Sequence, residues 1–388
     1  MKILITTHTQ YQKNAYAKHF ERAKYLAKLG NEVTFLITSN SRKIGFEEKI
    51  IDNVKVLMAP DLLWGVLRQG LCPWNIINRI IKLLVIGPFN SIHTIDSRPA
   101  TILPALVSKL IFKSKLFMEW TDLFGRGGAM TQRSSKLYQL TFGKIESFFE
   151  EYFRKYADGT FTISTYLTDL QNKHLNISKD KNKQLPLGSD MARIIDYDKK
   201  LLRLKMNLDI NKIFLIYVGN IYPDDEEVLI SVCNEILKKY DEVNIILIGM
   251  KFLNYSGKQQ YICPGFVDDE TLFDYLGAAD INLLPLKDNI TNNARFPSKM
   301  NDYFVTARPL VASPTGEIKI LYNNYKFGIL SDSDNQTDFR NAVLEMINSS
   351  DRWSEYGAEA VRCAREKFDN NILANQIIDH YKKCGVVE

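Results

Sequence analysis

The sequence predicts an α/β protein in which two doubly wound, parallel-sheet domains face each other across a cleft. Three observations support this fold class. The chain of 388 residues is too long for one ordinary core. Short apolar runs alternate with segments of helical periodicity, which is typical of a parallel sheet covered by helices on both faces. This alternation stops near residue 190 and then restarts.

In the first half, the alternation begins at the first residues. Buried strands are predicted at residues 2–7, 32–38, 91–95, 115–120 and 160–164. A first helix is predicted over residues 14–29, capped by Gly30, and a second follows Pro99. One long helix comes next, with an apolar side formed by Leu137, Leu140, Ile145, Phe148, Tyr152 and Tyr156.

The second half repeats this organisation. Strands are predicted at residues 214–218, 243–248, 261–267, 281–284 and 309–313. Helices are predicted over residues 228–237, before Leu276, and over 298–305 and 371–381. We therefore predict domains at residues 1–190 and 191–370, followed by a helix at 371–388 that crosses back to the first domain.

Charge divides the chain unequally. Residues 1–190 contain 27 Lys and Arg against 16 Asp and Glu, a net charge of +11, whereas the rest contains 23 against 29, or −6. A basic half favours an anionic membrane surface or a phosphorylated substrate. No basic motif interleaved with aromatics is present, so nucleic acid is not an expected partner. No segment predicts a signal peptide or a membrane span, so we expect a cytoplasmic protein.

The segment richest in chemistry is Arg295-Phe-Pro-Ser-Lys299-Met-Asn-Asp302-Tyr303, followed by a strand through Ser313. Pro297 and Ser298 are helix-start signals. Free amides at that start, with Arg295 and Lys299 beside them, suit a diphosphate, and Asp302 suits ribose hydroxyls. The alternative is an amphipathic helix whose Lys299 and Asp302 form a local surface pair.

This segment resembles the Pro-x-Lys-x-x-Glu/Asp-Tyr helix of family 4 retaining glycosyltransferases, which have the GT-B fold, and most of all the members with an Arg-Phe-Pro-x-Lys start. Further similarities, in order along the chain, are Ala27-x-Leu-Gly-Asn-Glu-Val33, Ile92-His93 before Asp96, Leu185–Asp190, Tyr217-Val-Gly219, Gly265-Phe-Val267 and Thr315-Gly-Glu317.

The resemblance implies that the C-terminal domain binds a nucleotide-sugar donor and the N-terminal domain binds the acceptor. Donor contacts are then expected from Gly219, Asn220, Phe266, Val267, Arg295, Lys299 and Asp302. Lys299 is also a catalytic candidate, because a cation there stabilises the departing diphosphate. These cations would replace a metal, so we expect no metal and no other cofactor.

Two departures limit this comparison. The first acid of the family's pair, eight positions before Asp302, is replaced by Ala294, which leaves recognition of the donor sugar open. Where the family has an Arg and a Lys after the Gly219 strand, this chain has the acidic run Asp224–Glu227. We interpret these acids as stabilising a helix N-terminus rather than facing a phosphate. Arg295 and Lys299 are then left to supply most of the positive charge.

Candidate acceptor-side residues follow the early strands. Glu119-Trp-Thr-Asp122 ends a strand, and Asp122 matches an acid of the family. A carboxylate there orients or deprotonates the acceptor, or stabilises positive charge at the anomeric carbon; the alternative is a turn cap. We therefore name Asp122 and Glu119 as catalytic candidates. The first loop supplies His8 and Asn14, and Arg98 completes the acceptor-side set.

The apolar stretch Leu62–Ile86 has two interpretations. It contains Trp64 and Trp74 with Arg68, Arg79 and Lys82, a composition typical of a helix in a membrane interface. The alternative is a helix packed on the first sheet.

We therefore expect a retaining glycosyltransferase that moves a sugar from a UDP- or GDP-sugar to a hydroxyl of a glycan or lipid-linked acceptor. The resemblance places it in synthesis of cell-surface polysaccharide, lipopolysaccharide or glycolipid, at the inner face of the cell membrane. The alternatives are a sugar-nucleotide epimerase of the same fold and a non-catalytic sugar-nucleotide-binding subunit.

Overall fold

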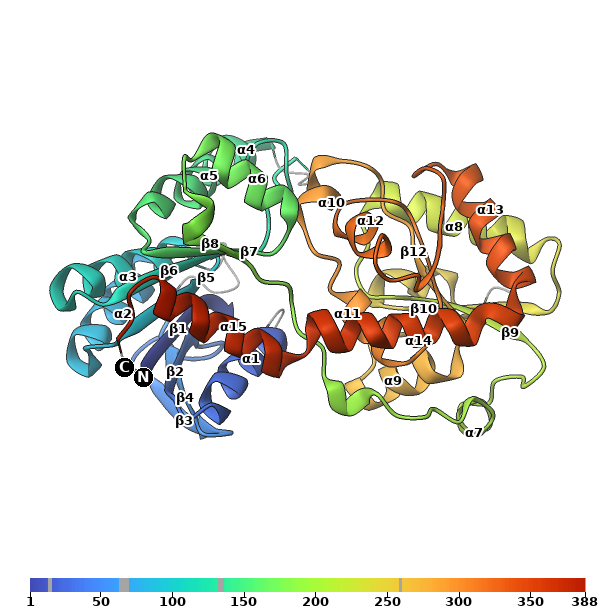
Figure 1. Cartoon of the computed structure of the whole chain (residues 1–388), viewed down its shortest axis with the longest axis horizontal. Helices are drawn as coiled ribbons and strands as arrows, with labels where there is room; N and C mark the ends of the chain where they lie inside the picture. The colour runs from blue at the N-terminus through green and yellow to red at the C-terminus, as the bar shows by residue number, and fades with distance from the viewer. Residues whose placement is uncertain (13–15, 63–69, 132–135, 258–259, 388) are drawn as a thin grey trace. The chain divides into compact units, whose positions relative to one another are not determined.

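The computed structural model describes residues 1–12, 16–62, 70–131, 136–257 and 260–387. The chain divides into two compact units, coloured along the sequence in Figure 1. The first unit comprises residues 1–188, 294–296 and 370–388, and the second comprises 189–293 and 297–369. The sequence placed the domain boundaries at residues 190 and 370.

The first unit is built on an eight-stranded sheet with the order β3-β4-β2-β1-β5-β6-β7-β8. Its neighbouring strands are parallel except for the antiparallel pair β3–β4. The strands are β1 (Lys2–Gln10), β2 (Glu32–Thr38), β3 (Glu47–Ile51), β4 (Val54–Ala59), β5 (Ser91–Ile95), β6 (Lys115–Trp120), β7 (Gly159–Thr162) and β8 (Asn182–Gln184).

Helices cover both faces of this sheet (Figure 1). They are α1 (Tyr16–Lys28), α2 (Pro73–Ile86), α3 (Pro99–Phe112), α4 (Lys136–Leu140), α5 (Phe142–Tyr152), α6 (Thr165–His174) and α15 (Asn370–Lys383). Apolar residues of α1 and α15 bury one face of the sheet, and residues of α2, α3 and α5 bury the other. The last helix of the chain therefore packs on the first sheet.

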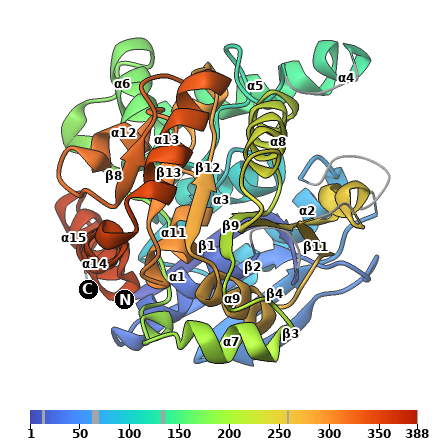
Figure 2. The same cartoon turned by 90° about the vertical axis from the view of Figure 1, so that its right-hand side faces the viewer.

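The second unit contains a six-stranded parallel sheet with the order β11-β10-β9-β12-β13-β14. Its strands are β9 (Ile213–Val218), β10 (Val243–Ile248), β11 (Tyr261–Gly265), β12 (Ile281–Leu284), β13 (Leu310–Ala312) and β14 (Gly328–Leu330). Its helices are α7 (Lys199–Lys205), α8 (Pro223–Leu237), α9 (Asp269–Ala278), α10 (Ile290–Ala294), α11 (Lys299–Val305), α12 (Glu317–Tyr322), α13 (Gln336–Asn348) and α14 (Trp353–Cys363). Figures 1 and 2 show α8 and α13 on one face of this sheet, and α7 and α9 on the other.

The predicted fold class, two doubly wound parallel-sheet domains, is confirmed. Each sheet reverses its strand order once, between β1 and β5 in the first unit and between β9 and β12 in the second. In open parallel sheets, ligands bind outside the carboxyl ends of the strands at such a switch point. The strand order therefore directs attention to the residues that follow β1 and β5, and to those that follow β9.

The predicted long helix is wrong in one respect, because it is broken at Thr141, between α4 and α5. Its apolar side is exposed. The buried side of α5 carries Glu146 and Glu150, followed by Arg154 in a 3₁₀ turn. Buried polar groups need partners, and these have them: Glu146 is paired with Arg98, and Arg154 donates from Nε to the Glu150 carbonyl at 2.7 Å. The sequence pattern alone does not reveal such an inverted helix.

Candidate functional site

The carboxyl edge of the second sheet presents open backbone next to its switch point. Gly219 follows β9 with φ of +87°, a conformation that favours glycine. A Cβ added at Gly219 would meet no atom within 4 Å, so space lies beside the chain here. Gly249 and Gly265, at the ends of the neighbouring strands β10 and β11, also have positive φ. Backbone of this kind admits a ligand close to the strand ends.

Lys299 lies directly beside this edge. Its ammonium group stands 3.8 Å from the centre of the Tyr217 ring, where a cation is attracted by the ring face. It also donates to the Tyr217 hydroxyl and, at 3.2 Å, to the carbonyl of Asn220. The Tyr217 hydroxyl donates to the same carbonyl at 3.1 Å. The sequence predicted Lys299 and Asn220 as donor contacts, but Tyr217, which holds the lysine, was missed.

The helix that carries Lys299 is anchored under the strand ends by a buried tyrosine. The Tyr303 hydroxyl accepts a hydrogen bond from the Val218 amide at 3.0 Å and lies 3.4 Å from the Leu283 carbonyl, to which it donates. These contacts join α11 to β9 and β12 on either side of the switch point. Asp302, the predicted ribose ligand, is half-buried on the same helix.

The acidic run after Asn220 lies in the first turn of α8, as predicted. Asp225 is buried and accepts hydrogen bonds from the Lys287 amide at 2.7 Å and from Asn292. Glu226 is paired with Lys251. The Lys251 ammonium group also lies 3.4 Å from the carbonyl of Ile221. Lys251, which the sequence analysis missed because it follows a different strand, therefore brings a second cation to the loop that Lys299 contacts.

The remaining residues that were predicted to bind the donor do not lie together in the structure. Phe266, directly after β11, is 82% exposed, which is unusual for so large an apolar side chain, and Val267 is half-buried. Arg295 and Ala294 group with the first unit. Ala294 is buried, and its carbonyl accepts a hydrogen bond from Ser164 at 2.7 Å. The structure therefore does not bring Arg295 together with Lys299 within one unit.

The carboxyl edge of the first sheet is crowded with titratable groups. Asp96, directly after β5, accepts hydrogen bonds from the Thr7 hydroxyl, the His8 amide, the Arg98 amide and the Thr101 hydroxyl, at distances of 2.9–3.1 Å. Its Oδ2 also lies 2.6 Å from His8 Nδ1. Burial raises the pKa of Asp96, but His8 and the backbone amides outweigh it and hold the pKa well below its usual range. The switch point of this sheet therefore carries a fixed carboxylate and an oriented histidine.

Asp122 lies in the loop after β6, beside Arg98. Surrounding protein raises the pKa of its carboxyl to about 6, against the opposing charges of Arg295 and Arg98. Asp122 is exposed to solvent, so water screens part of this effect. Arg98 is buried, paired with Glu146, and stacked on Phe124 at 4.9 Å.

The loop that carries Asp122 is fixed by α5. Glu150 accepts hydrogen bonds from the Trp120 indole and from the amides of Phe124 and Gly125, at 2.8–2.9 Å. Arg126 forms a bidentate pair with Glu151. The sequence analysis missed this support, because it considered only the apolar side of this helix. Asp122 is thus held in a preorganised position.

The prediction that Glu119 is catalytic is wrong, because the residue is buried. Glu119 is 0% exposed within β6, where it is paired with Arg22 of α1 and accepts from His93 Nε2 at 3.0 Å. His93 Nδ1 lies 2.7 Å from the Tyr381 hydroxyl of α15. Burial raises the pKa of Glu119, but Arg22 and His93 outweigh it and lower the pKa to about 2. Glu119 therefore joins two helices to the sheet and does not touch a substrate.

The remaining predictions concern the first loop and the stretch Leu62–Ile86, parts of which lie outside the described residues. Asn14 and Arg68 lie outside them. The prediction that Arg79 is a membrane-facing base is wrong. Arg79 is buried and donates hydrogen bonds to the Thr6 and Thr38 hydroxyls and to the Thr7 carbonyl at 2.9–3.0 Å. Lys82 is half-buried and paired with Glu48. No group of three or more His, Cys, Asp or Glu suited to a metal occurs within the described ranges.

Part of the second unit is similar to a known protein family. Residues 212–349 match the family described as "Glycosyl transferases group 1". A D-inositol 3-phosphate glycosyltransferase from Rhodococcus jostii (strain RHA1) is 20% identical over 249 residues, which cover 59% of this chain and 53% of that protein. The chain thus spans about half the length of the curated relative it matches.

Solved structures share the fold of the whole chain. Sucrose-phosphate synthase from Thermosynechococcus elongatus has a TM-score of 0.78 at 13% identity, covering 98% of each chain. Anabaena HepE, in complex with UDP and glucose, has a TM-score of 0.71 at 14% identity, covering 98% of this chain and 99% of that one. WaaG, a glycosyltransferase involved in lipopolysaccharide biosynthesis, has a TM-score of 0.71 at 13% identity, covering 97% and 98%.

Proposed function

We propose that this chain, whose residues 212–349 match a glycosyltransferase family and whose fold is that of solved GT-B structures, transfers a sugar from a UDP-sugar to a hydroxyl acceptor with retention of configuration. The second unit binds the donor and the first unit binds the acceptor. A GDP-sugar is the alternative donor. UDP is favoured because the similar HepE structure contains UDP and glucose, and a similar trehalose-6-phosphate structure contains UDP-2-fluoro glucose.

The observation that carries this proposal is Lys299 at the switch point of the second sheet. An ammonium group held over Tyr217, beside the open backbone of Gly219, suits the diphosphate of a nucleotide sugar. Lys251, next to the Ile221 carbonyl, suits a second phosphate contact. Phe266 offers an exposed aromatic face near the same strand ends for a nucleotide base. Asp302 remains the proposed ribose ligand.

The proposed chemistry is mainly electrostatic. When the bond between the sugar and the diphosphate breaks, negative charge grows on the diphosphate, and Lys299 and Lys251 stabilise it. Positive charge grows at the anomeric carbon, and an ionised Asp122 stabilises it from the first unit. Arg295, whose charge acts on Asp122, keeps that carboxyl more acidic than its surroundings alone would allow. Because these cations serve the diphosphate, we propose that no metal is required.

A thermal-shift screen tests the donor assignment. A ligand that binds only the native state raises the melting temperature. UDP, GDP and dTDP, each free and as a hexose conjugate, are compared on the wild-type chain and on Lys299→Ala. We expect the largest rise with a UDP compound, and a clear reduction in the variant. No rise with any nucleotide would contradict the proposal.

Two rival functions remain testable. A sugar-nucleotide epimerase would convert the donor to an isomer with no acceptor present, and chromatography of a donor-only incubation detects that product. A non-catalytic binding subunit, favoured by Ala294 and by the acids after Asn220, would bind a donor saturably without ever consuming it. Consumption that depends on an added acceptor separates our proposal from both.

We also propose that the first unit binds the surface of an anionic membrane, where it meets a lipid-linked acceptor. Helix α2 is inverted: it turns Asn75, Arg79 and Leu83 inward, while its exposed side is apolar. That side consists of Trp74, Ile77, Ile81, Leu84 and Val85. A soluble surface seldom exposes such a stripe without a partner. None of the described helices is long and apolar enough to cross a bilayer, so the proposed contact is peripheral.

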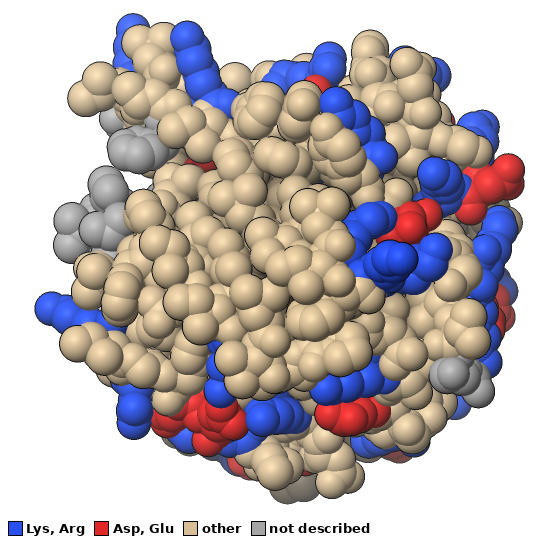
Figure 3. All heavy atoms as spheres, turned by 90° about the vertical axis from the view of Figure 1, so that its left-hand side faces the viewer, with Lys and Arg blue, Asp and Glu red and all other residues tan. Residues whose placement is uncertain are grey.

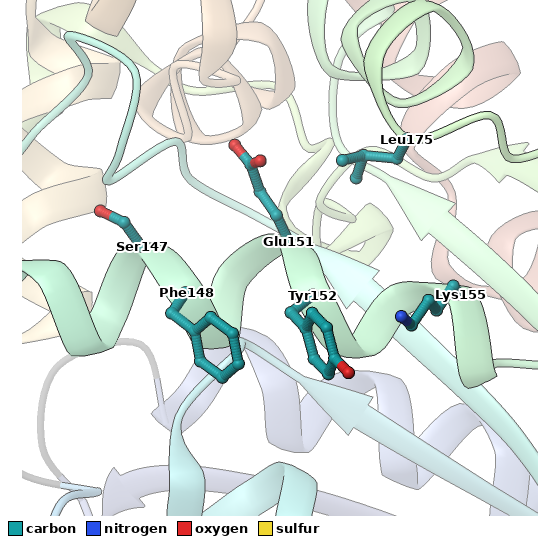
Figure 4. Close-up of a pocket in the computed structure, with 6 residues that line it drawn as sticks. All are labelled: Ser147, Phe148, Glu151, Tyr152, Lys155 and Leu175. Carbon is teal, nitrogen blue, oxygen red and sulfur yellow. The ribbon is translucent and has the colours of Figure 1, made fainter.

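Charge on the same side of the unit matches an anionic surface. Figure 3 shows the side where α2 and α3 lie, with a broad area free of charged side chains, bordered by Lys and Arg together with some Asp and Glu. Exposed Leu110 and Ile111 end α3, followed by Lys113. Lys155 stands 4.0 Å from the Tyr152 ring. In Figure 4, Phe148 and Tyr152 project together from one side of α5, away from Glu151, as suits an interfacial helix.

Flotation with liposomes tests this location. Vesicles with and without phosphatidylglycerol are compared at low and high salt. Each basic residue near the surface contributes about 1 kcal/mol, so binding is expected only to anionic vesicles and falls with salt. Ile77→Glu/Ile81→Glu should abolish flotation, whereas Ile50→Glu, on the exposed strand β3, should not. Failure of the wild-type chain to bind anionic vesicles at low salt would overturn the membrane proposal.

A further inference from the structure

Four lysines line a hollow of about 630 Å³ on the surface of the first unit. They come from separate parts of the chain, namely α3, the 3₁₀ turns before β7 and β8, and the end of α15: Lys109, Lys155, Lys181 and Lys383. Like charges that the fold brings together repel one another, so such a hollow favours an anion that neutralises them.

The hollow lies at the amino-terminal edge of the first sheet. Asp158 and Lys181, which line it, directly precede the parallel strands β7 and β8. The candidate acceptor site lies at the carboxyl edge, where β5 and β6 end. Because β5, β6, β7 and β8 are parallel, these two edges are at opposite ends of the strands. A ligand in the hollow therefore does not occupy the acceptor site.

One acid of the hollow already has its partners. Lys109 donates to the Asp158 carboxylate at 2.5 Å, and Lys115, at the start of β6, lies 3.6 Å from it. The Leu116 amide donates to the same carboxylate at 2.8 Å. Lys109 also donates to the Tyr156 carbonyl at 2.9 Å. Asp158 is thus committed to the lysines of α3 and β6.

The other three lysines of the hollow keep most of their charge. Lys383 lies 4.0 Å from Asp180, whose side chain is 91% exposed, so water screens this pair. Lys155 stands 4.0 Å from the Tyr152 ring, a contact that holds the ammonium group without neutralising it. Lys181 is exposed and forms no ion pair with a described residue. Three ammonium groups are therefore available to one anion.

Exposed apolar side chains border the hollow. Leu110 and Ile111 directly follow Lys109 on α3 and are 80% and 56% exposed. Tyr156, which lines the hollow, is 44% exposed. A small soluble anion needs only the cations, whereas a phospholipid presents a phosphate with acyl chains beside it. Lysines next to aliphatic and tyrosine side chains are the composition that suits a membrane interface. The combination favours a lipid over a soluble anion.

We propose that the hollow binds the headgroup phosphate of an anionic glycerophospholipid. Lys155, Lys181 and Lys383 contact the phosphate, and Leu110 and Ile111 lie beside the acyl chains. This inference rests on the proposed membrane location of the first unit and gives that contact a specific lipid ligand. Basic pockets at a membrane surface bind anionic headgroups in this way.

A short-chain lipid tests the hollow without a membrane. Isothermal titration calorimetry compares dihexanoyl phosphatidylglycerol, below its micelle concentration, with dihexanoyl phosphatidylcholine, glycerol 3-phosphate and inorganic phosphate. The phosphatidylglycerol should bind, and the phosphatidylcholine should bind roughly tenfold more weakly, because its choline cation opposes the lysines. Glycerol 3-phosphate or inorganic phosphate that binds as tightly as the phosphatidylglycerol would overturn the assignment to a lipid.

A double substitution with a matched control locates the bound lipid. Lys155→Gln/Lys181→Gln leaves the ion pair of Lys109 in place, so the variant should fold. It should lower the affinity for phosphatidylglycerol by about 30-fold, the scale of two lysines at an anionic surface. Lys238→Gln/Lys239→Gln, an exposed pair of the second unit that removes the same charge, should leave the affinity unchanged. Unchanged affinity in the first variant would overturn the proposal.

A photoreactive lipid gives a readout that needs no variant. Phosphatidylglycerol with a diazirine in its acyl chain is illuminated with the wild-type chain, and mass spectrometry locates the label. We expect the label at Leu110, Ile111 or Tyr156. A label confined to other parts of the chain would place the lipid outside the hollow and overturn the proposal.

The outcomes separate this inference from the proposed membrane location. If the short-chain lipid does not bind while the chain floats with anionic vesicles, the hollow is not a lipid site and the membrane location stands. If the short-chain lipid binds, and Lys155→Gln/Lys181→Gln weakens it, while the chain does not float, the membrane location fails and the hollow remains a phospholipid site.

Discussion

The switch points of the two sheets are built in opposite ways. That of the second unit is open: glycine backbone ends three neighbouring strands, and two lysines reach the carbonyls of the following loop. That of the first unit is crowded: His8, Asp96, Arg98 and Asp122 gather there, and their neighbours fix each of them. The contrast matches the proposed division of roles, in which the second unit binds the donor and the first unit binds the acceptor.

The largest effect is expected inside the first sheet rather than at its edge. Glu119→Ala should lower the free energy of unfolding by about 3–5 kcal/mol, because it leaves the buried charge of Arg22 unpaired. Denaturant unfolding followed by circular dichroism measures this loss. A loss below about 1 kcal/mol would mean that Glu119 belongs with the functional edge after all.

The pH dependence of that stability has a definite sign. The folded pKa of Glu119, about 2, lies below its ordinary value of 4.5. Its stabilising contribution is therefore complete above pH 4.5 and is lost as the pH falls toward 2. The wild-type chain should lose more stability than Glu119→Gln between these pH values.

Three residues further along, Asp122 should affect turnover rather than folding. Asp122→Asn should lower kcat by about 100-fold, the scale of removing one group that stabilises transition-state charge. Donor affinity should stay unchanged, because the proposed donor contacts lie in the second unit. Since the pKa of Asp122 is raised to about 6, kcat of the wild-type chain should fall as the pH drops below that value. Collapse of donor binding in Asp122→Asn would contradict the assignment of the two edges.

At the open edge, Lys299→Ala should weaken donor binding by roughly 10- to 150-fold, because a charge-assisted contact contributes about 1.5–3 kcal/mol. Lys251→Ala should have a smaller effect, since Glu226 already neutralises part of that charge. Isothermal titration calorimetry with UDP measures both. Equal losses of affinity in the two variants would show that Glu226 does not weaken the contribution of Lys251.

Gly219→Ala should have only a small effect on folding. Positive φ costs a residue with a Cβ about 1–2 kcal/mol, and no atom stands within 4 Å of the added carbon. The variant should therefore fold, with a slightly lower melting temperature, yet bind UDP less tightly because the methyl group occupies the open space. Wild-type affinity in this variant would place the nucleotide elsewhere.

The sequence predicted the site at the carboxyl edge of the second sheet better than the site at the carboxyl edge of the first, and the reason is physical. Lys299, Asn220 and Gly219 lie within short motifs whose spacing reflects a strand, a turn and a helix. Asp96 and His8 are 88 residues apart, and only the crossover from β1 to β5 brings them together. Glu119 and Arg79 have the residue types of a functional site but point into the core. Helices α2 and α5 expose apolar residues, so periodicity located the helices but did not reveal that their buried sides carry polar groups.

The most direct test of the account is a transfer assay observed by proton magnetic resonance. The wild-type chain is incubated with UDP-glucose and with GDP-mannose, each alone and with a set of alkyl glycosides. The account predicts release of the nucleoside diphosphate only when an acceptor is present, with a new glycoside that keeps the configuration of the donor. Conversion of a donor to an isomeric sugar nucleotide in the absence of acceptor would contradict it.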